Sequence, residues 1–197
     1  METFLTFLQL GFEHITDLNG YDHILFVLSL CAVYTIWDWK RVLILVTAFT
    51  VGHSITLALA ALQILSFDQD LIEFLIPVSI LITCLTNLFQ QNGRNGQILQ
   101  ERKTLRYLFA AFFGLIHGMG FSTYLRSLLG KSSQIVNELL AFNIGLEIGQ
   151  LLIVIASFVM SFLAIEIFKI KRTIWNLISS SFLAGMTFHL LLEKWYF

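Results

Sequence analysis

The stretch LLAFNIGLEIGQLLIVIASFVMSFLAIEIF, residues 139–168, decides the fold, because its apolar character is interrupted only by isolated polar side chains. An α-helix needs about 20 predominantly apolar residues to cross the hydrocarbon of a bilayer. The stretch exceeds that length and carries just two carboxylates, Glu147 and Glu166. It is therefore predicted to form a transmembrane helix.

Further apolar runs of similar length lie on both sides of this stretch, at 21–37, 42–65, 71–89, 105–121 and 174–192. The chain is 57% hydrophobic and 13% charged, whereas a soluble domain carries roughly 25% charged residues. We predict an all-α, polytopic membrane bundle of about six transmembrane helices, in which 1–197 is one domain, 20–192 is the bundle and 90–103 is a cytoplasmic loop.

The charges predict an orientation for this bundle in the bilayer. Nine of the twelve lysines and arginines lie in the first, third and fifth connections, and cytoplasmic loops are enriched in these residues. Both termini are then expected on the outer side of a bacterial inner membrane. The cations are scattered between apolar runs and the net charge is -1, so nucleic acid is not expected as a partner.

The first 19 residues differ from the predicted spans. Leu5, Leu8, Phe12 and Ile15 recur at helical spacing, with polar side chains on the opposite face. This pattern predicts an amphipathic interfacial helix that lies on the outer surface of the bilayer.

Ionisable side chains inside the spans point to a functional site, because such groups are unfavourable in lipid. Counting along each span places them in the outer half of the bilayer. Imidazole and carboxylate together are typical ligands of Ni, Co, Zn or Fe(II), and no CxxC pair indicates a thiolate site. We therefore predict a divalent metal site, with ligands drawn from seven residues: His14, Asp22, His23, His53, His117, Glu147 and His189.

Polar neighbours of these residues are predicted to orient the ligands through hydrogen bonds. Asn143, Glu147 and Gln150 form one stripe on their helix, which should face the bundle interior, and Ser54 follows His53 directly. Gly145 and Gly149 lie on another face, where small residues permit close helix packing.

Four stretches of the chain resemble the HupE/UreJ family of small membrane proteins, usually described as nickel or cobalt permeases: GYDHILFVLSL (20–30), FTVGHSITLAL (49–59), FGLIHGMGFS (113–122) and FNIGLEIGQLL (142–152). The resemblance implies transport or supply of a divalent metal, with Asp22, His23, His53, His117 and Glu147 at the motif positions. In that family a histidine usually lies five residues before the Asp-His pair, whereas seven residues separate His14 from Asp22 here. We therefore expect His14→Ala to be milder than His23→Ala.

Two functions remain open at this point. In a transporter, the ion would bind in the outer half and cross when the bundle opens inward, although the inner half offers only hydroxyls and amides such as Thr83 and Asn87. In a zinc-dependent hydrolase of lipids or lipoproteins, three histidines would hold zinc and the metal-bound water would attack the substrate. Its general base would be Asp22 or Glu147, and Ser54 is a less favoured nucleophile. The metal, the coupling ion and the formation of a homo-oligomer stay open.

Overall fold

The computed structural model describes residues 2–64, 67–89, 101–129 and 134–195. Within these residues the chain forms helices and no strand, which confirms the predicted all-α membrane bundle. Residues 90–100 of the predicted loop lie outside the described part of the chain. The helices are α1 (Glu2–Thr16), α2 (Asp22–Cys31), η1 (Ile36–Asp38), α3 (Trp39–Ala61), α4 (Gln69–Phe89), α5 (Glu101–Leu129), α6 (Ile135–Phe162), the π-helical η3 (Leu163–Ile167) and α7 (Arg172–Glu193).

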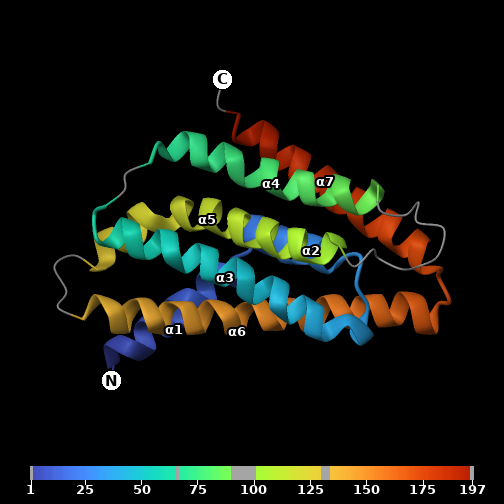
Figure 1. The fold of residues 1–197 in the computed structure, drawn as a ribbon, viewed down its shortest axis with the longest axis horizontal. Coiled ribbons are helices and arrows are strands. Elements are labelled where there is room, and N and C mark those ends of the chain that lie inside the picture. The colour runs from blue at the N-terminus through green and yellow to red at the C-terminus, as the bar shows by residue number, and fades with distance from the viewer. Residues whose placement is uncertain (1, 65–66, 90–100, 130–133, 196–197) are drawn as a thin grey trace.

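Five helical segments in the described residues are long and apolar enough to cross a membrane. They match the last five predicted spans and run back and forth along the long axis of the molecule (Figure 1). The first predicted span, 21–37, is corrected by the structure: its helix, α2, has only 10 residues. At about 1.5 Å per residue it covers roughly half the thickness of the hydrocarbon.

The chain leaves the helical conformation after α2 because protein groups satisfy its backbone there. The Tyr34 N–H donates to the Cys31 carbonyl at 2.8 Å, and Arg172 donates to the Val33 carbonyl at 2.8 Å. Thr35 and Asp38 then form a capping box that begins η1. Irregular backbone at membrane depth is tolerated where the protein supplies such partners.

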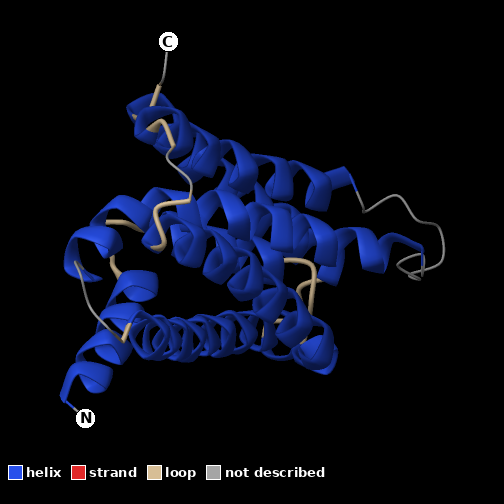
Figure 2. Cartoon of the chain, turned by 60° about the vertical axis from the view of Figure 1, so that its left-hand side comes forward, coloured by secondary structure: helices blue, strands red, loops and turns tan. Residues whose placement is uncertain are grey.

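The long helices form pairs around α2. The closest pairings are α3 with α5, α1 with α6, and α4 with α7, while α2 contacts α4, α6 and α7. Figure 1 shows the α4 and α7 pair on one side of the bundle and α6 on the other, and Figure 2 shows the same layers in a rotated view. The short helix α2 is therefore enclosed by the other helices.

Glycines set the closest of these helix contacts. A Cβ added at Gly114 of α5 would collide with the Phe49 carbonyl of α3, and one at Gly145 of α6 would collide with the Leu8 carbonyl of α1. The predicted packing role of Gly145 is thereby confirmed, and its partner is α1. The N-terminal helix exists as predicted, but it packs lengthwise along α6 instead of lying apart on the surface.

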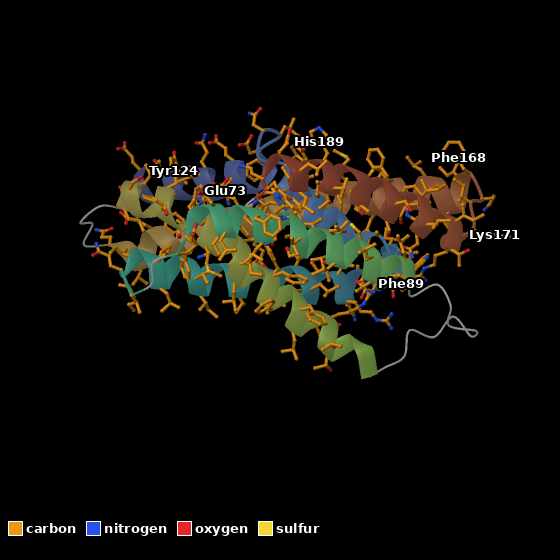
Figure 3. All side chains as sticks on the ribbon, turned by 90° about the horizontal axis from the view of Figure 1, so that it is seen from above. Glu73, Phe89, Tyr124, Phe168, Lys171 and His189 are labelled. Carbon is orange, nitrogen blue, oxygen red and sulfur yellow. The ribbon has the colours of Figure 1, made fainter. Side chains whose placement is uncertain are left out.

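The first and fifth connections, both basic, meet at one end of the bundle, which we call the basic end. Arg41 and Arg172, from the first and fifth connections, both pair with Asp38, at 2.7 and 3.1 Å. Figure 3 shows Phe89 and Lys171 toward this end and Tyr124 toward the opposite end. We call that opposite end, where α3 ends and α4 begins, the cavity end.

Candidate metal centre

Three helices bring one histidine each to a common point. His14 on α1, His23 on α2 and His53 on α3 have ligand nitrogens that all lie within 4.8 Å of one another. The His14 and His23 ring centroids are 4.5 Å apart, and the His53 ring lies 5.9 Å from each. We call these three residues the histidine cluster.

His117 of α5 lies next to the cluster. Its ring centroid is 5.1 Å from that of His23, and its side chain is fully buried. Its Nδ1 donates to the Phe113 carbonyl at 2.9 Å, which leaves Nε2 as the nitrogen able to bind a metal. His117 is thus positioned as a fourth ligand or as a close neighbour of one.

Five buried histidine nitrogens lack hydrogen-bond partners among the described residues. The Nε2 atoms of His14, His23, His53 and His117 and the Nδ1 atom of His53 are all in this state. Buried polar atoms in proteins are nearly always paired. Several unpaired imidazole nitrogens that face one another therefore fit a shared divalent transition metal, for which neutral imidazole is a good ligand.

Asp22 orients the central histidine of this group. Its Oδ1 lies 2.8 Å from His23 Nδ1 and accepts the His23 backbone N–H at 2.8 Å. A carboxylate on one ring nitrogen fixes the tautomer, so that the other nitrogen presents its lone pair to a metal. If a metal were bound here, Asp22 would act on it through His23.

A cavity of about 210 Å³ reaches the histidines from the cavity end. His14, Asp22, His23 and His117 line its inner part, while Glu73 and Lys194 line it farther out. Figure 3 labels Glu73 on α4. Neither Glu73 nor Lys194 was predicted from the sequence to belong to a site. The feature that could have indicated them is that both are charged residues at the ends of predicted spans, on the same side of the bilayer.

The predicted polar stripe on α6 faces α3. Three side-chain hydrogen bonds join the two helices: Ser54 to Asn143 at 2.6 Å, Thr50 to Gln150 at 2.8 Å, and Thr47 to Glu147 at 3.0 Å. Ser54 follows His53 directly, so its bond to Asn143 positions the segment of α3 that carries His53. The Ser54 Oγ also lies 2.7 Å from the Thr50 carbonyl oxygen, so its single hydrogen is shared between that carbonyl and Asn143 Oδ1, as expected of a packing hydroxyl.

Two predicted ligands lie away from the histidine cluster. Glu147 pairs with Thr47, which is six residues from His53, or about 9 Å along α3. His189 is 69% exposed and pairs with Glu193 at 3.5 Å, and Figure 3 shows it at the edge of the molecule. The reasons differ: Glu147 faces α3 but meets it farther along the helix than His53, whereas the side chain of His189 leaves α7 on an exposed face.

We expect Glu147→Gln to leave divalent metal affinity nearly unchanged, because a glutamine oxygen can still accept the hydrogen bond of the Thr47 hydroxyl. Calorimetric titration of the wild type and the variant would measure this. A large loss of affinity in the variant would instead support the sequence prediction that Glu147 is a ligand.

His14 is placed in the cluster, against the expectation that it is a weaker contributor. The centroid of its ring is 3.8 Å from the ring centroid of Phe121 and 4.5 Å from that of His23. We therefore expect His14→Ala to reduce metal affinity as strongly as His23→Ala does in the same titration. A clearly milder effect would restore the ranking that the motif spacing predicts.

The fold and the cluster together define a class: a polytopic helical membrane protein with buried histidines from several helices. A family model described as HupE / UreJ protein matches residues 1–196. The chain belongs to the HupE/UreJ family, as its motifs indicate. The comparison with curated proteins and the comparison with solved structures each found no match.

Proposed function

We propose that this protein binds a divalent transition metal at the histidine cluster and transports it across the membrane or supplies it to a metalloenzyme, with nickel or cobalt as the ion. The observation that carries the proposal is the convergence of His14, His23 and His53. Membership in a family associated with nickel and cobalt transport supports the choice of ion.

The cluster accounts for capture of the ion. A hydrated cation that enters the 210 Å³ cavity meets Asp22 and the Nε2 atoms of His23 and His117. Exchange of some of its water for neutral imidazoles compensates for the loss of hydration in the bundle. The cavity opens at one end, so release on the opposite side requires a rearrangement of the helices.

The basic end holds the contacts that such a rearrangement would break. Arg106 donates to the Tyr34 hydroxyl at 2.9 Å and to Asn87 at 3.4 Å, while Asn87 donates to the Ser29 carbonyl at 2.7 Å. Asn176 of α7 donates to the Asn87 carbonyl at 3.0 Å. These bonds tie α2, α4, α5 and α7 together. The positive charge of the Arg106 guanidinium also opposes the passage of a metal cation.

One observation favours a zinc-dependent hydrolase as the alternative. Three histidines beside a cavity with a carboxylate on its wall are the parts that a catalytic zinc site requires, with the metal-bound water in the open position. Of the three catalytic candidates from the sequence, Asp22 lines the cavity, whereas Glu147 and Ser54 are engaged between α3 and α6.

Proteoliposomes distinguish the two functions. The transport proposal expects uptake of Ni²⁺ or Co²⁺ by vesicles that contain the wild type, with uptake lost in His53→Ala. Metal content of the purified protein is measured first. Bound zinc without uptake of any ion, together with metal-dependent cleavage of ester or amide lipids, would replace transport by hydrolysis.

Orientation is proposed from the charges, with the basic end in the cytoplasm and the cavity end outside. A cysteine that replaces Lys171 is expected to react with a membrane-impermeant thiol reagent only from the cytoplasmic side, and one that replaces Asp70 only from outside. Cys31 and Cys84 are buried and should stay unlabelled in intact protein. Labelling of both introduced cysteines from the same side would contradict this orientation.

A further inference from the structure

An exposed ion pair stands at the mouth of the cavity that leads to the histidines. Lys194, just after α7, places its Nζ 2.6 Å from Oε2 of Glu73 on α4. The side chains are 44% and 38% exposed, so water reaches the pair from outside. Both residues also line the cavity. An ion that enters by this route therefore passes Glu73 before it meets an imidazole.

Two features make Glu73 suited to hold a cation. Pro77 lies four residues later in α4 and has no N–H, so the Glu73 carbonyl lacks its usual helical donor, and the Glu73 side chain lines the cavity. Gln69 donates to the Gly120 carbonyl at 2.8 Å and to Glu73 Oε1 at 3.4 Å. Gln69 thereby ties the start of α4 to α5 and orients the carboxylate.

The ammonium of Lys194 is a replaceable occupant of this position. Exposed ion pairs are weak, and lysine carries a point charge on a flexible stem. A divalent cation has twice the charge and binds carboxylate and carbonyl oxygens while it keeps part of its water. Deeper in the same cavity, the buried His23 and His117 present unpaired Nε2 atoms, which bind a transition metal more firmly than oxygen does.

We propose that Glu73 is a capture site for divalent cations, that Lys194 occupies it in the absence of the ion, and that the captured ion passes from Glu73 to the histidines. This inference rests on the proposed function of the histidine cluster. It assigns to Glu73 a role in the rate of binding, whereas the histidines set the final affinity.

A second cavity provides the competing route. It has a volume of about 630 Å³, is lined by Glu13, Asp17 and Tyr124, and shares His14 and Phe121 with the first cavity. Of the histidines it reaches His14 alone. The first cavity reaches His23 and His117 as well, which favours it as the path of the ion.

The test measures how fast Zn²⁺ and Ni²⁺ bind to the full-length protein in lipid nanodiscs, by stopped-flow mixing with a fluorescent metal indicator. Glu73→Gln is expected to slow association roughly three- to tenfold, at or below the lower end of the ~10–10³-fold enhancement that a whole charged cleft gives, with little change in Kd. Lys194→Gln is expected to accelerate it. In the Glu73→Gln background, Lys194→Gln should have no further effect, because the ammonium acts by occupying that carboxylate.

Glu193→Gln is the matched control, because Glu193 is an exposed carboxylate at the same end that pairs with His189 and does not line the cavity. Equal slowing by Glu193→Gln and Glu73→Gln would overturn the inference in favour of general surface charge. Slowing by Glu13→Gln alone would overturn it in favour of the second cavity. Normal rates in Glu73→Gln, with His53→Ala still deficient in binding, would refute the capture site and leave the proposed function intact. Failure of the wild type to bind either ion would refute both.

Discussion

Replacement of His53 by alanine is expected to weaken divalent metal binding roughly 100-fold or more. The His53 ring is fully buried on α3, and neither of its nitrogens has a hydrogen-bond partner among the described residues. Loss of a group that merely orients a ligand already reduces metal affinity about 10–100-fold. Loss of a ligand itself should exceed that range, and competition against a chelator of known affinity would measure it.

The matched control is His189→Ala. His189 was also predicted to be a ligand, but its imidazole is exposed and lies away from the histidine cluster. It should bind metal like the wild type. Because removal of a buried side chain can also destabilise a protein, thermal unfolding of both variants without metal must be compared. Similar unfolding with unequal metal affinity would assign the effect to ligation. Equal affinities in His53→Ala, His189→Ala and the wild type would remove His53 from the site.

The depth of the site could be predicted from the sequence, because transmembrane helices fix how far each residue lies from the membrane surface. His23, His53 and His117 come from different helices and meet as their common depth indicates. Rotation about each helix axis is less constrained. His189, for example, leaves α7 on an exposed face and pairs with Glu193. Glu147 is displaced in depth instead: it shares the stripe of Asn143, but it pairs with Thr47, about 9 Å from His53 along α3.

The course of the first 35 residues could not be predicted from periodicity. The apolar run 21–37 has the length of a span, but Arg172 and the Thr35 to Asp38 capping box end its helix early. Arg172 comes from the far end of the chain, and the capping box is a local turn. Neither changes the hydrophobicity of the run 21–37, so neither could be read from the apolar pattern. Similarly, α1 is amphipathic like a surface helix, but Gly11 lets its backbone approach Phe142 of α6. That contact places His14 in the cluster.

The glycine contacts that assemble the site lead to a second strong expectation, for Gly114→Ala. In most helices this change stabilises the helix by roughly 1 kcal/mol. Here a Cβ at Gly114 would collide with the Phe49 carbonyl and approach the His53 backbone, and both belong to the helix that carries His53. A helix backbone cannot yield as a flexible side chain can, so α3 and α5 must separate.

We therefore expect Gly114→Ala to lower the free energy of unfolding by about 1–3 kcal/mol, the usual range for overpacking. It should also weaken metal binding, because α3 and α5 carry His53 and His117. Gly185→Ala is the control: nothing lies within 4 Å of a Cβ at Gly185 of α7, so the same substitution should be neutral or slightly stabilising. Denaturant unfolding in mild detergent would compare the two. An opposite sign for the two variants would show that close α3 and α5 packing holds the histidines together, whereas equal stability would mean that the helices can separate without loss.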